Sequence, residues 1–279
     1  MKRLLQLTIG AMLGLATIVA TSTEPQYVQA QAGASGGKYD ALRQWPNYAF
    51  QVGEKLTFDI SYGVITAGEA VMEVPMMRTI NDRRAYEVNV KAKSLPSFDW
   101  MFKVRDRYTT YIDEKGIFPW RFDQVVREGK YSRDFSASFD PTTKTAVTTD
   151  KKTHVTPAYV HDIVSAFYYV RTLDLAKAKK GDVIKLENFY KDRSHPLNIK
   201  VLGRQKVETE AGTFNTIVLE PMVVEGGLFK NEGSIKIWLT DDYNKMPVKM
   251  STKILIGSID AELSKYEGVR NPIAAKVGK

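Results

Sequence analysis

Residues 53–74 read GEKLTFDISYGVITAGEAVMEV, and this stretch decides the expected fold. Apolar side chains alternate with polar or small ones from Leu56 to Val64, so one face suits a core and the other suits water. This period of two residues predicts a half-buried β-strand. Gly68 and its small neighbours interrupt the pattern, and an interior glycine is typical of a strand that bends sharply. We therefore expect a curved sheet.

The same alternation recurs along the chain. Roughly a dozen segments between Phe50 and Glu267 have it, for example residues 86–92, 135–139 and 235–239. Turn-forming sequences such as Asn81-Asp82 and Asp140-Pro141 separate these segments. The pattern predicts a mainly β protein, with about a dozen antiparallel strands in a β-barrel, a sandwich or a strongly curled sheet.

One segment has a helical period instead. Between residues 161 and 180, apolar side chains recur on one stripe: Ile163, Ala166, Phe167, Val170 and Leu173. Asp162 is suited to the start of a helix, and the lysines near Gly181 are suited to its end. We expect one main α-helix over about 161–180 that plugs or flanks the sheet.

The N-terminus has the features of a secretory signal peptide. Lys2 and Arg3 precede an uncharged run over residues 4–20, and small residues end the polar stretch that follows. The run is short for a membrane span, which needs about 20 predominantly apolar residues. We expect cleavage after Ala30 or Ala32 and export to the periplasm or outer envelope, without a transmembrane anchor.

These patterns suggest one folded unit between two tails. We expect a signal peptide over residues 1–32, a flexible tail over 33–49, a single barrel-like domain over 50–267 and a C-terminal tail over 268–279. The chain has no cysteine, so disulfides, thiolate metal ligands and a bacterial lipid anchor are all excluded. The expected protein is therefore not a lipoprotein and is stabilised by a packed core.

The charge is basic, with 40 Lys and Arg residues against 32 Asp and Glu residues and a net charge of +8. The cations are scattered along the chain rather than grouped, which favours a solvated surface over a nucleic-acid site. Among polyanions, we therefore expect only anionic material of the cell envelope as a partner.

Sequence motifs for catalysis lack a suitable context. The three histidines, His154, His161 and His195, have no further ligand at helix or strand spacing, so we expect no zinc site. Residues 33–37 match the letters of a hydrolase nucleophile elbow, but they fall in a Gly/Ser-rich tail. There is no phosphate-binding loop or dinucleotide fingerprint. We expect no catalysis, no cofactor and no metal.

Polar and aromatic residues supply candidate contacts. In the predicted strand Val104-Arg105-Asp106-Arg107-Tyr108, Asp106 shares a face with Val104 and Tyr108. An interior Asp106 would contact a polar ligand or pair with an arginine such as Arg171. The candidate ligand or partner contacts are Trp100, Arg105, Asp106, Arg107, Tyr168, Arg171 and Trp238.

The order of several motifs resembles a known family. They are Gly-Glu-x-Leu-x-Phe-x-Ile-x-Tyr-Gly with Ala67-Gly68, Val-Arg-Asp-Arg-Tyr before Asp113, the helix with Asp162, Ser165, Tyr168 and Arg171, and Ile-Lys-Ile-Trp-Leu-Thr-Asp-Asp before Pro247-Val248. From about Phe50 to Glu267 the chain resembles the uncharacterised exported bacterial family of domain of unknown function 3108. The resemblance implies a YmcC-like antiparallel β-barrel in the Gram-negative envelope. It implies no reaction and no catalytic residues.

Two functions fit these observations. The first is a periplasmic or envelope-associated binding or accessory protein, whose barrel interior or mouth accepts an apolar or amphiphilic molecule such as a lipid or glycolipid. The second is a structural protein with a solid barrel, which contacts an envelope protein or an anionic glycan through a basic or aromatic patch. Neither function involves nucleic acid. The sequence contains no feature that indicates the oligomeric state.

Overall fold

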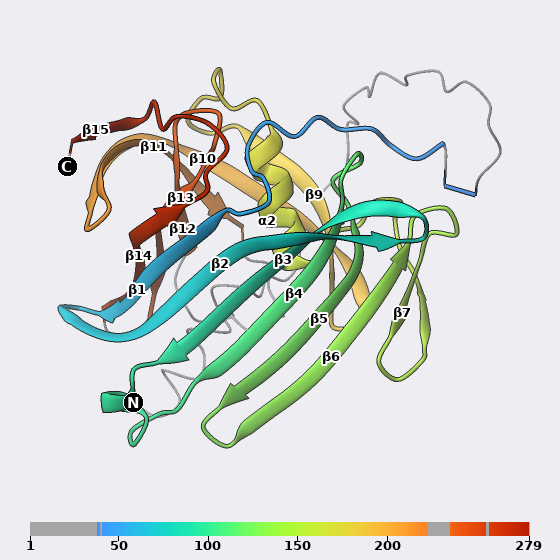
Figure 1. Cartoon of the computed structure of the whole chain (residues 1–279), viewed down its shortest axis with the longest axis horizontal. Helices are drawn as coiled ribbons and strands as arrows, with labels where there is room; N and C mark the ends of the chain where they lie inside the picture. The colour runs from blue at the N-terminus through green and yellow to red at the C-terminus, as the bar shows by residue number, and fades with distance from the viewer. Residues whose placement is uncertain (1–37, 40, 223–234, 255–256, 279) are drawn as a thin grey trace.

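The computed structural model describes residues 38–39, 41–222, 235–254 and 257–278, so the predicted signal peptide lies outside the described residues. Fifteen strands form one antiparallel sheet (Figure 1). The strands are β1 Lys55–Tyr62, β2 Ile65–Ile80, β3 Arg83–Ser94, β4 Arg105–Asp113, β5 Pro119–Glu128, β6 Tyr131–Asp140, β7 Thr145–Thr148, β8 Thr153–Val155, β9 Val183–Tyr190, β10 Arg193–Thr209, β11 Gly212–Pro221, β12 Ile235–Thr240, β13 Pro247–Lys253, β14 Ser258–Glu267 and β15 Lys276–Gly278. The helical elements are η1 Pro96–Phe98 and α2 Ile163–Thr172.

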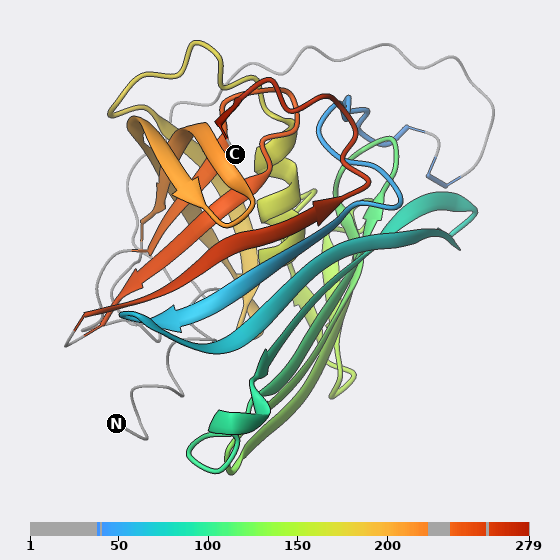
Figure 2. The ribbon, with the colours of Figure 1, turned by 60° about the vertical axis from the view of Figure 1, so that its left-hand side comes forward.

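The sheet curls but is not closed by hydrogen bonds. Its order is β8-β7-β6-β5-β4-β3-β2-β1-β14-β13-β12-β11-β10-β9, and β15 pairs with β11. The pairing of β1 with β14 joins the two halves of the chain, and α2 lies between the two walls that they form (Figure 2). Side chains partly bridge the two edges, since Phe139 and His154 both pack on Phe189 of β9. The prediction of a strongly curled antiparallel sheet with one main helix is confirmed.

Helix α2 is shorter than the predicted span of 161–180. Asp162 caps its start, because the carboxylate accepts from the backbone N–H groups of Val164 and Ser165 at 2.8 and 2.9 Å. Leu173 already has extended backbone angles. The chain then turns away so that Leu175 is buried against a second apolar cluster with Ile199 and Leu219. Tertiary packing therefore ends the helix before the lysine-rich stretch.

The opening segment forms a hairpin rather than one long strand. Gly63 and Val64 make the turn between β1 and β2, so Val64 lies outside the alternating face on which the sequence places it. The pairing of β1 with β2 shifts beside Gly68, the residue at which the sequence predicts a sharp bend. A Cβ atom at Gly68 would lie 2.8 Å from the carbonyl oxygen of Lys93, so only glycine fits this close approach.

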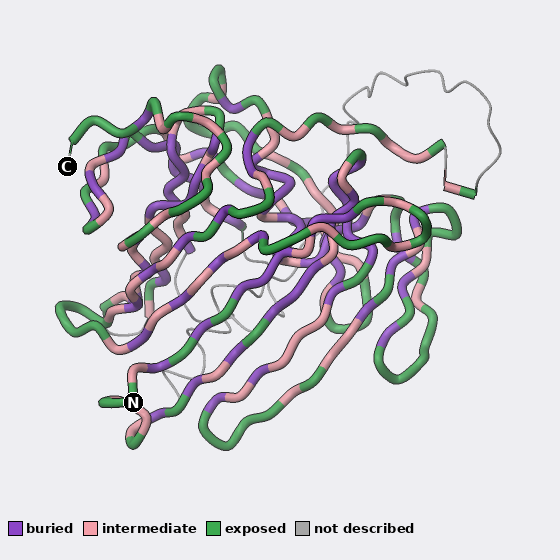
Figure 3. Tube along the Cα trace, in the orientation of Figure 1, coloured by how far each residue is buried: buried purple, intermediate pink, exposed green. Residues whose placement is uncertain are grey.

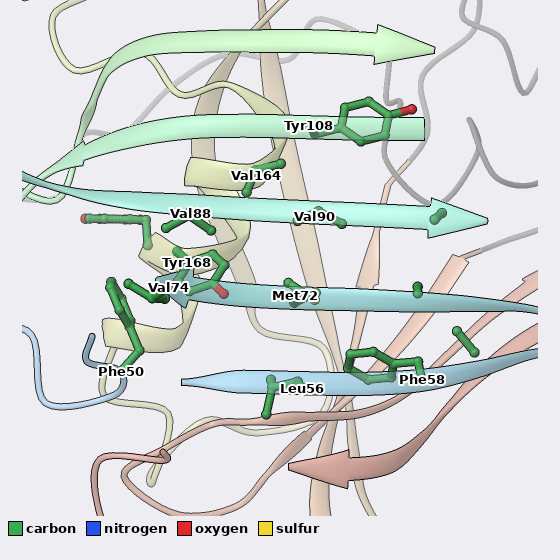
Figure 4. Packing of buried hydrophobic residues seen from close by; sticks show 14 of the residues in the cluster. Phe50, Leu56, Phe58, Met72, Val74, Val88, Val90, Tyr108, Val164 and Tyr168 are labelled. Carbon is green, nitrogen blue, oxygen red and sulfur yellow. The ribbon is translucent and has the colours of Figure 1, made fainter. Parts of the chain in front are cut away.

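The core fills the inner side of the curled sheet. Buried and exposed residues alternate along the long strands, as the period of two predicts (Figure 3). Aromatic residues fill the end of the interior nearest the C-terminus of α2, where Phe50 and Tyr168 pack edge to face at 4.8 Å beside Val74 (Figure 4). On neighbouring strands, Met72 and Val90 line the next part of the interior.

Candidate functional site

An apolar cavity of about 90 Å³ lies between α2 and the concave face of the sheet. The eighteen described residues that line it are all apolar, and α2 contributes five of them, including Ala166 and Phe167. The remainder come from both walls, for example Ile60 of β1 and Ile237 of β12. A buried water needs two to four polar partners, and the side chains of these described residues offer it none.

Three alanines create the space. Ala70 of β2 and Ala92 of β3 are direct partners in the antiparallel ladder, and Ala166 faces the same cavity from α2. The next inward pair along these two strands is Met72 and Val90, whose larger side chains fill their positions. The cavity therefore forms where small side chains from three elements converge.

Both ends of α2 are anchored to the sheet by buried polar contacts. At its C-terminal end, the guanidinium of Arg171 donates to both carboxylate oxygens of Glu54 at 2.7 Å, and both side chains are fully buried. Burial opposes the charged form of Arg171, but the charge and hydrogen bonds of Glu54 raise its pKa. At the other end, Thr110 of β4 donates to the Asp162 carboxylate at 2.7 Å. These contacts hold the helix over the cavity.

A histidine, an aspartate and a serine lie together at the start of α2, but their geometry is that of a helix cap. The Ser165 hydroxyl donates to the backbone carbonyl of Asp162, and His161 Nδ1 lies 3.3 Å from the same hydroxyl. Burial lowers the pKa of His161, whose ring packs on Tyr169 at 4.8 Å. All three side chains that form this group are buried, so no substrate reaches them in this conformation.

Asp106 is buried on the inner face, which both alternatives for this residue require. Its Oδ1 accepts from the backbone N–H of Arg127 at 2.8 Å, whereas Arg171 is bound to Glu54 on another part of the core. Of the arginines considered as partners of Asp106, Arg171 is therefore ruled out, and the arginine that contacts this carboxylate is Arg127, through its backbone. Burial raises the pKa of Asp106, although the Arg127 N–H and the Glu128 carboxyl group oppose this shift.

The other candidate contacts do not gather at one site. Arg105 binds Asp99 at 2.7 Å, Arg107 is exposed, and Trp100 is exposed on the loop between β3 and β4. Tyr168 is buried beside Phe50, away from the lining of the cavity. Trp238 is buried and donates to Gln205 at 2.8 Å, whereas its neighbours Ile237 and Leu239 line the cavity from the opposite face of β12.

Sequence reasoning missed the alanines that form the cavity. The alternation does place Ala92 on the same face as Val90. A small residue at an inward position was therefore the one feature of the sequence that pointed to a cavity. The pairing of Ala92 with Ala70 and their approach to Ala166 come only from the tertiary structure. Within the described ranges, no group of three or more His, Asp or Glu residues could hold a metal ion.

The family model described as protein of unknown function (DUF3108) matches residues 57–264, which is more than half of the chain. The chain belongs to the DUF3108 family. The family expected from the order of the sequence motifs is therefore confirmed. No curated protein matches the chain.

Solved structures include similar folds. One is a β-barrel-like protein of domain of unknown function DUF1849 from Brucella abortus, which is 13% identical with a TM-score of 0.51, and the match covers 78% of this chain and 98% of that one. A protein with a YmcC-like fold from Bacteroides fragilis NCTC 9343 is 10% identical with a TM-score of 0.35, covering 81% and 99% respectively. The first similarity supports the barrel-like fold. Among the described residues, no helix has the length and apolar character to cross a membrane.

Proposed function

We propose that this protein is a non-catalytic binding protein of the cell envelope, and that it holds an acyl chain in the cavity between α2 and the sheet. The observation that carries the proposal is that every described residue lining this cavity is apolar. The signal-peptide features of residues 1–32 support the envelope setting.

The size of the cavity suits part of a flexible apolar chain. A water-sized group needs about 10–15 Å³ of such space, so 90 Å³ accommodates roughly six to nine groups of this size. The cavity extends from Ala166 of α2 to Pro221 and Ile235, which lie at the ends of β11 and β12. A chain of linked methylenes fits this elongated arrangement better than a rigid polar molecule.

The described lining offers no group for acid–base or nucleophilic chemistry. None of the described cavity residues is ionisable, and His161 and Asp162 make contacts within the helix cap instead. Catalysis of proton transfer requires a titratable group within hydrogen-bond reach of the reacting atoms. These features favour binding over turnover.

Native mass spectrometry of the purified protein, followed by organic extraction, tests the proposal. We expect a co-purifying lipid, and displacement of a fluorescent fatty acid by unlabelled fatty acid. The variant Ala166→Leu should fill the cavity and lower fatty-acid affinity by at least about tenfold, because its added methylenes occupy the binding volume. The exposed variant Ala176→Leu is the matched control and should bind normally.

Two results would contradict the proposal. One is an apo mass together with no measurable fatty-acid binding by the folded protein. The other is equal affinity for Ala166→Leu, Ala176→Leu and the unaltered chain. Either result would favour the second function, a structural protein with a solid interior that contacts an envelope protein or an anionic glycan.

A further inference from the structure

Neighbouring hairpin turns expose large apolar side chains at one end of the sheet. Val64, at the tip of the β1–β2 turn, is 100% exposed, and Trp100 on the β3–β4 loop is 84% exposed. Ile65 lies next to Val64 and is also exposed. These three side chains are grouped on neighbouring turns rather than scattered singly, and such a group is typical of an interaction site.

These turns are joined into one continuous edge, which we call the hairpin rim and define as residues 62–65, 94–105, 128–131, 253–254 and 257–258. Gly257 lies against the Tyr62 ring, since a Cβ atom there would be 3.4 Å from it. The backbone N–H of Leu95 donates to the carbonyl oxygen of Ala67 at 2.9 Å, and the backbone N–H of Gly129 donates to the carbonyl oxygen of Lys103 at 2.8 Å. Figure 2 shows the β1–β2 and β3–β4 turns along the same border of the molecule.

The fold does not require apolar residues at these tips. Gly63 has a φ of +59° and supplies the conformation that the tight turn needs, so a polar residue would serve equally well at position 64. The indole N–H of Trp100 donates to the carbonyl of Ser97 at 2.9 Å. Its polar atom is therefore satisfied by its own loop, and the ring is presented outward as apolar surface.

The charge of the hairpin rim is positive. Lys103, Lys130 and Lys253 are exposed in or beside its turns. Its two acidic residues within the described chain are Asp99, which is bound by Arg105 at 2.7 Å, and Glu128, which is buried. An apolar tip surrounded by exposed lysines is complementary to a bilayer with anionic headgroups.

We propose that the hairpin rim docks on an anionic lipid bilayer. Trp100, Val64 and Ile65 enter the interfacial region, while Lys103 and Lys130 contact the headgroups. Tryptophan favours this zone because its ring is apolar and its edge is polar. Docking goes beyond the binding of a chain in the cavity and does not depend on it, because none of these five side chains lines the cavity.

Co-sedimentation of the purified protein with lipid vesicles tests the inference. We expect binding to vesicles of phosphatidylglycerol and phosphatidylethanolamine, and much weaker binding to phosphatidylcholine alone. Replacing Lys103 and Lys130 by glutamine should weaken binding by about fivefold for each lysine. Val64→Ser combined with Trp100→Ala should weaken it by at least about tenfold, because apolar contact with the bilayer is lost.

Matched controls lie at the other end of the sheet. Val155→Ser and Lys180→Glu remove an exposed apolar side chain and an exposed cation there, and both should leave vesicle binding unchanged. Ala166→Leu should also bind vesicles normally, which separates this inference from the proposed function. Absence of vesicle binding, or equal losses in the rim and control variants, would overturn the inference. Self-association through the rim would also overturn it. That outcome would be a dimer, detected by sedimentation velocity, that Trp100→Ala abolishes, together with no binding to vesicles.

Discussion

Ala70 and Ala92 face each other across β2 and β3, and both methyl groups line the apolar cavity beneath α2. The neighbouring inward pair consists of Met72 and Val90, so the space arises from one rung of small residues in an otherwise well-filled wall. An empty apolar cavity of this volume lowers stability by roughly 2 kcal/mol, at about 24 cal/mol per Å³.

We predict that Ala70→Val stabilises the ligand-free protein by about 1 kcal/mol, because its added carbons fill existing space. Urea unfolding at neutral pH would measure the change. Ala137→Val is the matched control, since Ala137 is fully buried on β6 and does not line the cavity. It should destabilise the protein by about 1–3 kcal/mol. Destabilisation by both variants would show that the cavity does not persist in solution.

Breaking the Glu54–Arg171 ion pair at the end of α2 should strongly destabilise the protein. Glu54→Gln leaves the buried Arg171 guanidinium without its countercharge, and we expect a loss of about 3–5 kcal/mol. Thermal unfolding followed by circular dichroism would report it. Asp134→Asn breaks the exposed pair with Arg127 and should change the melting temperature little. A small effect of Glu54→Gln would mean that water reaches the Arg171 site.

Asp106 should make the protein less stable as the pH rises. Its pKa is raised in the folded state, so between its unfolded pKa near 4 and its folded pKa the native chain binds more protons than the unfolded chain. The stability contributed by its protonated form is lost as the pH increases through that window. Asp106→Asn should remove this dependence while still accepting from the Arg127 N–H.

The measurement is the free energy of unfolding as a function of pH for Asp106→Asn and for the unaltered chain. Asp82→Asn, at an exposed turn, is the control and should follow the unaltered profile. If Asp106→Asn also followed the unaltered profile, the raised pKa of Asp106 would be refuted.

His161 should make the protein less stable as the pH falls, opposite to the effect of Asp106. Its folded pKa is lowered by burial, so below about pH 6.5 the unfolded chain takes up a proton that the native chain does not. Stability then falls with decreasing pH by at most about 1.4 kcal/mol per pH unit until the folded pKa is reached. His161→Phe keeps an aromatic ring against Tyr169 and should lose this acid sensitivity in urea unfolding. If His161→Phe kept the full slope of stability against pH, another group would be the cause of the acid sensitivity.

The alternation of apolar and polar residues predicts most of the strands, and the burial of Val88 and Val90 confirms the inward face that it gives for β3. Asp162 likewise marks the start of the helix correctly. These features depend on neighbours within a few residues, where backbone geometry links sequence spacing to side-chain direction. The order of local motifs also pointed to the correct family.

Other features depend on which strands become neighbours. The pairing of β1 with β14 brings residues about two hundred positions apart into contact, and the binding of Arg171 to Glu54 joins residues 117 positions apart. The cavity exists because Ala70, Ala92 and Ala166 converge from three elements, and each alanine alone has an ordinary local pattern. Local periodicity therefore determined the strands and the start of the helix, whereas long-range pairing decided where α2 ends and where the small side chains meet.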